Sequence, residues 1–88
     1  MRHINEETMQ HLADVQSRHI EELMSLANVV GTGIGLAMKD GVYTDEPAII
    51  VMVTLKMPLA QLNPMDVVPR EIEDCRIDVQ ETGSFIAH

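Results

Sequence analysis

The first third of the chain spaces its apolar residues as an amphipathic helix does, and this pattern predicts a helix over residues 5–27. Asn5 is a favourable N-cap, and two glutamates follow it, at the positive end of the helix dipole. Gln16 and His19 interrupt the apolar half. At about 100° per residue, that half of the helix holds Met9, Leu12, Ala13, Val15, Ile20, Leu23, Met24, Leu26 and Ala27.

The next stretch, residues 28–57, has the pattern of a β-hairpin. Residues 29–39 alternate with a period of two, and Asp40-Gly41 suits a two-residue turn whose central positions need positive φ. Pro47 cannot donate to a strand ladder, so we expect an interruption near it. The run 48–57 is apolar on both faces through Val53, which is typical of a central strand covered on both sides.

The last third predicts a short helix and loop over residues 58–74, a third strand over 75–82 and a tail over 83–88. Pro58 suits the start of a short helix to Leu62, and the loop is long enough to connect two parallel strands. We therefore expect one α+β domain, residues 1–88, with a small mixed sheet and the order α-β-β-α-β. The tail carries an exposed apolar pair, Phe85-Ile86.

Composition suggests that this domain associates with itself. The chain has 88 residues, and its only aromatic residues are Tyr43 and Phe85, so the core depends on aliphatic side chains and seven methionines. A small sheet that its own helices cannot cover on both faces commonly completes its core with another copy. We therefore expect a homo-oligomer, and burial of Gln16 and His19 against a second copy of the helix is one alternative to their simple placement at the edge of the core.

Charge and cysteine content narrow the partners and the location. The formal charge is −8 and no two basic residues are adjacent, so we expect neither nucleic acid nor an anionic membrane as a partner. No apolar run approaches the roughly 18 residues that a membrane span needs, and the first residues lack an apolar signal core. Cys75 alone cannot form an internal disulfide, which fits the cytoplasm.

The glycines Gly31, Gly33 and Gly35 invite comparison with a phosphate-binding loop, but they lie inside a β-alternating stretch that no helix follows. A dinucleotide fingerprint would also need a small residue where Leu36 stands. We interpret the three glycines as a shallow strip that another element approaches closely. The N-terminal helix is the favoured occupant, and the side chains or backbone of a partner are the alternative.

No catalytic, cofactor or metal site emerges from the remaining residues. His19 and Glu22 are three apart and could share a metal ion, but such a pair is common by chance. The acidic C-terminal third is typical of a solvated face, and Cys75 begins an alternating strand, as a buried structural thiol does. The three serines stand in no nucleophile context. We expect a protein that is not an enzyme and holds no cofactor.

Several segments together resemble a known group of sequences: residues 28–35 (NVVGTGIG), 44–51 (TDEPAIIV), 55–59 (LKMPL), 68–69 (VP) and 77–79 (IDV). They are similar to the short segment upstream of the trypsin-like domain in some bacterial trypsin-like serine peptidases, and to related stand-alone hypothetical proteins. The resemblance covers about residues 20–82. In that group the catalytic residues lie in the following domain, so it implies an accessory or interaction role and transfers no catalytic residue.

Three functions follow as hypotheses. The first is a non-catalytic interaction or assembly module that self-associates. The second is a peptide-binding accessory domain that works with a separate peptidase or other enzyme, through an exposed sheet edge or the glycine strip. The third is a small protein that binds a metal ion or ligand. The candidate packing or partner surface consists of Gly31, Gly33, Gly35, Gln16, His19, Phe85 and Ile86.

Overall fold

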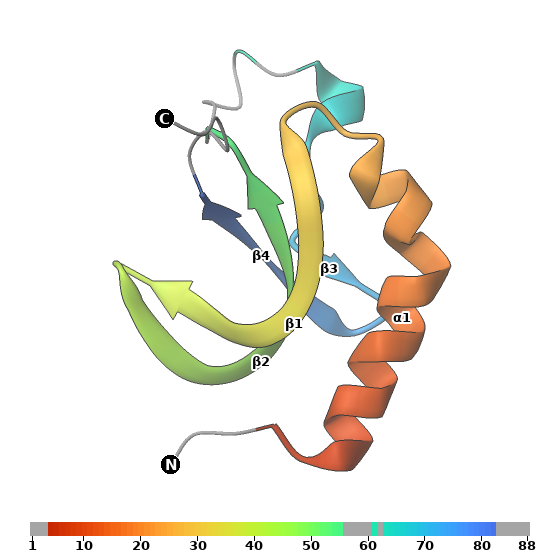
Figure 1. The fold of residues 1–88 in the computed structure, drawn as a ribbon, viewed down its shortest axis with the longest axis vertical. Coiled ribbons are helices and arrows are strands. Elements are labelled where there is room, and N and C mark those ends of the chain that lie inside the picture. Colours follow the sequence, from red (N-terminus) through yellow and green to blue (C-terminus); the bar gives the residue numbers. More distant parts are fainter. Residues whose placement is uncertain (1–3, 56–60, 62, 83–88) are drawn as a thin grey trace, which may run out of the picture.

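A computed structural model describes residues 4–55, 61 and 63–82 of the chain. One helix, α1 (Glu6–Met24), packs against a four-stranded sheet, which confirms the expected α+β class (Figure 1). The strands are β1 (Val29–Lys39), β2 (Val42–Val53), β3 (Glu71–Ile72) and β4 (Cys75–Glu81).

The sheet is mixed, as expected. Its order is β1-β2-β4-β3: β1 and β3 each run antiparallel to their neighbour, while β2 and β4 are parallel. In the segment of the chain that connects these two parallel strands lies a 3-10 helix, η2 (Pro64–Asp66), where we expected a loop. The short helix that we expected over residues 58–62 lies outside the described residues except for Gln61.

The N-terminal helix begins where its cap predicts but ends three residues early. The side chain of Asn5 accepts a hydrogen bond from the Thr8 amide at 2.8 Å, which satisfies one free N–H group of the first turn. At the other end, the hydroxyl of Ser25 donates to the carbonyl of Glu22, and Asn28 turns the chain with a left-handed φ of 69°. Local side-chain bonds of this kind compete with the helix, and α1 stops at Met24.

The hairpin has the turn and the interruption that the sequence predicts. Asp40 and Gly41 have φ angles of 52° and 80°, which suit a turn with positive φ at both positions. The register slips where Leu36 pairs with Pro47 but Met38 pairs with Tyr43, leaving two extra residues on β2. A second irregularity leaves one extra residue on β1, between Val29 and Gly31.

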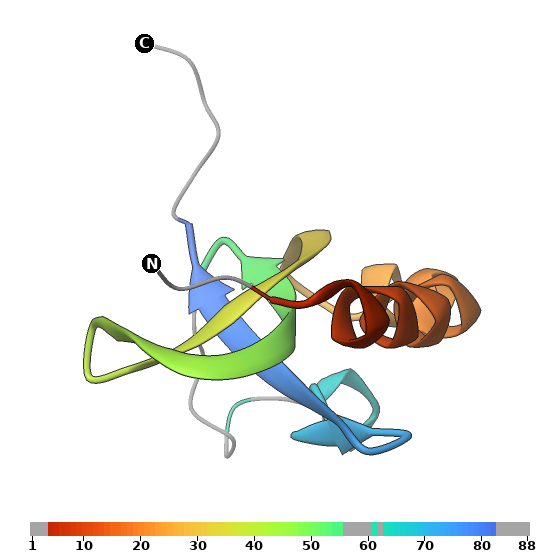
Figure 2. The same ribbon diagram turned by 90° about the horizontal axis from the view of Figure 1, so that it is seen from below.

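The larger core lies between α1 and one face of the sheet. Figure 2 shows the helix on that side alone. From α1 the core contains Leu12, Val15 and Leu23, and from the sheet it contains Ile49, Val51, Val53, Cys75 and Ile77. A smaller cluster of Ala37, Ala48 and Ile50, with Met52 against it, lies apart from this core. The central strand β2 therefore contributes side chains to both clusters, as its continuous apolar run predicts.

Candidate functional site

The glycine strip faces away from the helix, so its expected packing against α1 is wrong. Opposite residues of paired strands share a face, and Gly33 and Gly35 pair with Ile50 and Ala48 of the smaller cluster. Their neighbours Thr32 and Ile34 pair instead with Val51 and Ile49, which pack against α1. A side chain added at Gly33 would meet no atom of the described residues within 4 Å, whereas one added at Gly31 would meet Met52 and one at Gly35 would meet Ile50. The strip therefore has open space at its centre only.

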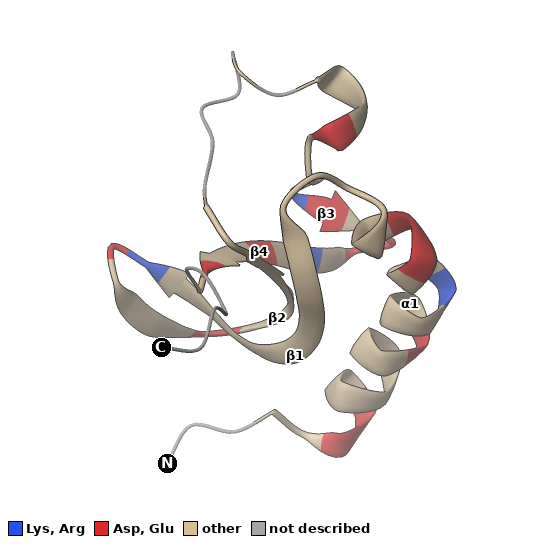
Figure 3. Ribbon diagram, turned by 45° about the horizontal axis from the view of Figure 1, so that its top comes forward, with Lys and Arg blue, Asp and Glu red and all other residues tan. Residues whose placement is uncertain are grey.

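Strand β1 forms one edge of the sheet (Figure 1). It is 11 residues long and contains no proline, and its only charged residue is Lys39 at the end, next to the hairpin tip (Figure 3). Natural proteins protect exposed edges with charges, prolines or very short strands, and the opposite edge, the two-residue β3, is short in this way. A bulge is another such device, and besides Lys39 β1 has the bulge near Val30, whose side chain is 37% exposed.

A stripe of uncharged residues on α1 runs beside this edge. Gln16 lies in the middle of the stripe, and its side-chain amide donates to the hydroxyl of Thr32 on β1 at 2.9 Å. Its larger apolar members are exposed to a similar degree: Met9 by 40%, Ile20 by 40% and Met24 by 43%. We call the free edge of β1 and this stripe together the edge surface; its residues on α1 are Met9, Ala13, Gln16, Ile20 and Met24.

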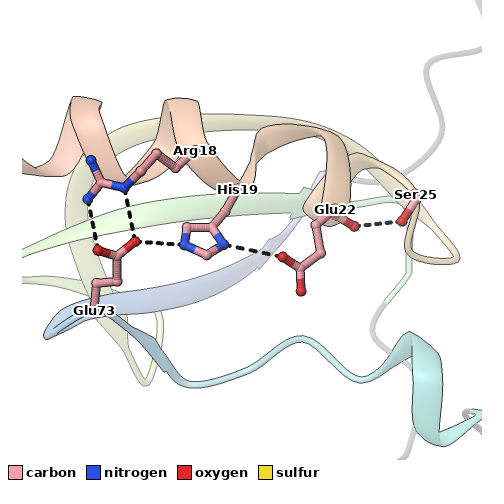
Figure 4. Close-up of polar contacts among 5 residues, drawn as sticks. All are labelled: Arg18, His19, Glu22, Ser25 and Glu73. Atoms are coloured by element: carbon pink, nitrogen blue, oxygen red, sulfur yellow. Dashed lines mark hydrogen bonds and ion pairs between the residues drawn. The ribbon is translucent and has the colours of Figure 1, made fainter.

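The other flank of α1 carries a chain of charged side chains (Figure 4). Arg18 donates through Nε and Nη2 to the two carboxylate oxygens of Glu73, at 3.1 and 2.9 Å. His19 lies between two carboxylates, with Nε2 2.8 Å from Glu73 and Nδ1 3.2 Å from Glu22. We call these four residues the charged clasp. It connects α1 to the turn between β3 and β4.

The geometry of the charged clasp favours a protonated histidine. A neutral imidazole donates through one nitrogen alone, whereas both nitrogens of His19 face carboxylate oxygens. The hydrogen bond to Glu73, then that to Glu22, raises the pKa of His19. Hydrogen bonds from Arg18 and His19 lower the pKa of Glu73 to about 2. The clasp is therefore an ion-pair network at the surface.

Gln16 and His19, which the sequence grouped as two interruptions of one apolar face, thus serve opposite flanks of α1. The possible metal pair of His19 and Glu22 is hydrogen-bonded within the clasp. Among the described residues, no group of three or more His, Cys, Asp or Glu side chains is arranged to hold a metal ion. Phe85 and Ile86 lie outside the described residues.

Two further groups are structural. Cys75 is buried in the larger core, and burial raises the pKa of its thiol, as the interpretation of a structural thiol requires. Asp78, on β4, is 8% exposed and accepts hydrogen bonds from the Met38 amide at 2.9 Å and from Gln80 at 3.0 Å. The first of these bonds joins β1 to β4, two strands away.

Sequence reasoning missed Glu73 and the exposed stripe. Glu73 is 55 residues from Arg18, and no local pattern connects them. The sequence did indicate the exposed stripe. Apolar residues cover half of the helical wheel, whereas contact with a single core needs a sector of only about 100°. One part of that half packs on the sheet, and another part is left beside β1.

Comparison with known proteins comes from a family model. The model that describes the NARROW LEAF 1 N-terminal domain matches residues 5–80, which include α1, β1, β2, β3 and all of β4 except its last residue. The search of curated proteins finds no match to the chain. No helix in the described part of the chain is long and apolar enough to cross a membrane.

Proposed function

The chain belongs to the family of the NARROW LEAF 1 N-terminal domain, and from this premise we propose that it is a non-catalytic interaction module that assembles with a second copy through the free edge of β1. The observation that carries the proposal is the edge itself. An 11-residue apolar edge strand presents a row of backbone donors and acceptors, which a strand of another chain can pair with.

Charge supports the choice of this surface. Each copy carries a formal charge of −8, so two copies repel one another in most orientations. Contact costs least where neither copy presents an acidic residue. Along β1 the sequence holds no Asp or Glu, and the larger exposed side chains of the α1 stripe are apolar. The edge surface is thus suited to a neighbour of the same charge.

The family and the sequence agree with an accessory role. The family is described as an N-terminal domain, which is the position of a module attached to further domains. The resemblance to segments upstream of a trypsin-like domain points the same way, and the sequence contains no recognisable catalytic constellation. A cytoplasmic location is part of the proposal, supported by a single buried cysteine.

Sedimentation of the purified chain at micromolar concentrations tests the proposal with a matched pair of variants. Val30→Lys places a charge on the edge of β1, and Val42→Lys makes the same change on β2 beside the hairpin tip, where valine is 64% exposed. We expect the unmodified chain and Val42→Lys to sediment as dimers, and Val30→Lys to dissociate at least tenfold more readily. A compact monomer at every concentration would contradict the proposal.

A second candidate function, peptide binding by an accessory domain, is favoured by the space at Gly33. The fold leaves room there for a ligand side chain, and the backbone of Gly33 has no left-handed φ that would require glycine. Gly33→Val should therefore fold normally while filling the strip. If the chain instead binds extended peptides selected from a random library, Gly33→Val should weaken that binding. Equal binding by the variant would exclude the glycine strip as the peptide site.

A further inference from the structure

We infer that the second copy docks with its α1 against α1 of the first, around a two-fold axis that passes beside Gln16 and Thr32. The inference rests on the proposed self-association and adds the partner's position. Its starting point is the hydrogen bond between these two residues, which fixes the middle of the exposed stripe against the edge strand. Helix stripe and strand edge therefore form one continuous surface.

Symmetry determines how two such surfaces meet. Identical edges that pair antiparallel are related by a two-fold axis perpendicular to the sheet. This axis leaves both helices on the same face of the extended sheet. Because the stripe of each α1 borders the paired edge, the two stripes face each other across the axis, and the helices run antiparallel.

The stripe is complementary to itself in this arrangement. Gln16 stands near the midpoint between Met9 and Met24, so an axis beside it sets Met9 opposite Met24 of the partner subunit. The same axis sets Ala13 opposite Ile20 of the partner subunit. A small side chain thus receives a large one at each step, which is how packed helices interlock. An axis placed elsewhere would leave one methionine of each copy without an apolar neighbour.

The size of the contact suits a reversible dimer. The stripe extends about 22 Å along α1, since each helical residue advances about 1.5 Å. Together with the paired strands this buries on the order of 1,000 Å², at the low end for specific interfaces. We therefore expect a dissociation constant in the micromolar range. The charged clasp lies on the other flank of α1 and takes no part.

Cysteine cross-linking tests the position of the axis. Ser17→Cys places a thiol on α1 beside the predicted axis, and Ser25→Cys places one at the C-cap, as a matched control of the same chemical change. In the predicted dimer the two copies of position 17 are offset by about 1.5 Å along the helices, and those of position 25 by about 25 Å. Cys75 is buried, so the native thiol stays unreactive under mild oxidation.

We expect Ser17→Cys to form a dimer linked by a disulfide and Ser25→Cys to form no disulfide between subunits. We also expect Ile20→Asp to raise the dissociation constant at least tenfold. Val42→Asp introduces the same charge at a more exposed position outside the edge surface and should leave the constant unchanged. Circular dichroism verifies that each variant folds. A dimer that sediments normally but fails to cross-link through position 17 would overturn this inference alone, whereas a monomeric chain would overturn the proposed function as well.

Discussion

On one flank of α1, Arg18, His19 and Glu22 are engaged with one another or with Glu73, whereas on the other flank Met9, Ile20 and Met24 remain about 40% exposed. The charged flank is completed by the chain itself, through the turn between β3 and β4. The apolar flank borders β1, which pairs with β2 on one side and with no described strand on the other. A helix can thus belong to a closed fold on one side and to an assembly on the other.

The contrast between the buried core and the apolar flank of α1 should give the largest effect. Leu23 is 1% exposed and holds α1 to the sheet, whereas the adjacent Met24 is 43% exposed in the edge surface. Leu23→Ala should lower the free energy of unfolding by about 3 kcal/mol, because it leaves a cavity in a packed core. Met24→Ala should cost the monomer less than about 1 kcal/mol and weaken the dimer.

Chemical denaturation at low protein concentration measures the first effect, and sedimentation measures the second. Equal losses of monomer stability from the two variants would mean that Met24 already has a full set of neighbours within one copy. The apolar flank would then be packed within one copy, and its distinction from the charged flank would fail.

Gln16 gives the next effect, on the apolar flank. Replacing it with methionine keeps its length and removes the half-buried hydrogen bond to Thr32, so the monomer should lose about 1 kcal/mol of unfolding free energy. If the axis passes beside this residue, the same variant adds apolar surface at the centre of the interface and should tighten the dimer. Loss of both monomer stability and dimer affinity would place Gln16 in the fold alone.

The sequence predicts the elements better than the faces on which they pack. The Asp40-Gly41 turn, the interruption at Pro47 and the parallel connection all follow from local chemistry and loop length. The side of the sheet that α1 covers depends on area. A helix gains about 25 cal/mol for each Å² of apolar surface that it buries, so it covers Ile49 and Val51, and glycines offer it almost nothing.

The charged clasp could not be predicted because it depends on a turn without a turn signal. Glu73 and Asp74 both take positive φ, at 47° and 66°, in positions where no glycine or asparagine indicates a hairpin. The strand that leads into this turn, β3, has only two residues, too few for an alternating pattern. Arg18 therefore meets Glu73 through tertiary structure alone.

Removing the clasp's shared carboxylate should have a smaller effect than the changes above. Glu73→Gln breaks the paired bonds of Arg18 and the closest contact of His19, so the variant should unfold at slightly lower denaturant concentration. The side chain of Glu73 is 44% exposed, and water and salt screen such ion pairs. Glu71→Gln, two residues away, is the control. The difference between the variants should shrink in 1 M salt, and a salt-independent loss would mean that the pairing is not electrostatic.

The pH dependence of stability should be the finest test of the charged flank. The pKa of Glu73 is about 2 in the fold against 4.5 for a free glutamate, so its contribution is present above pH 4.5 and is lost as the pH falls toward 2. The pKa of His19 is raised above 6.5, so its contribution is present below 6.5 and is lost as the pH rises through the raised value. The clasp should therefore be strongest between about pH 4.5 and 6.5.

In His19→Gln the loss of unfolding free energy above pH 6.5 should diminish, whereas His11→Gln, outside the clasp on the same helix, should keep the profile of the unmodified chain. The affinity of the dimer should not change in either variant, because the edge surface contains no part of the clasp. If the dimer instead dissociates over the pH range in which His19 loses its proton, the charged and apolar flanks are coupled.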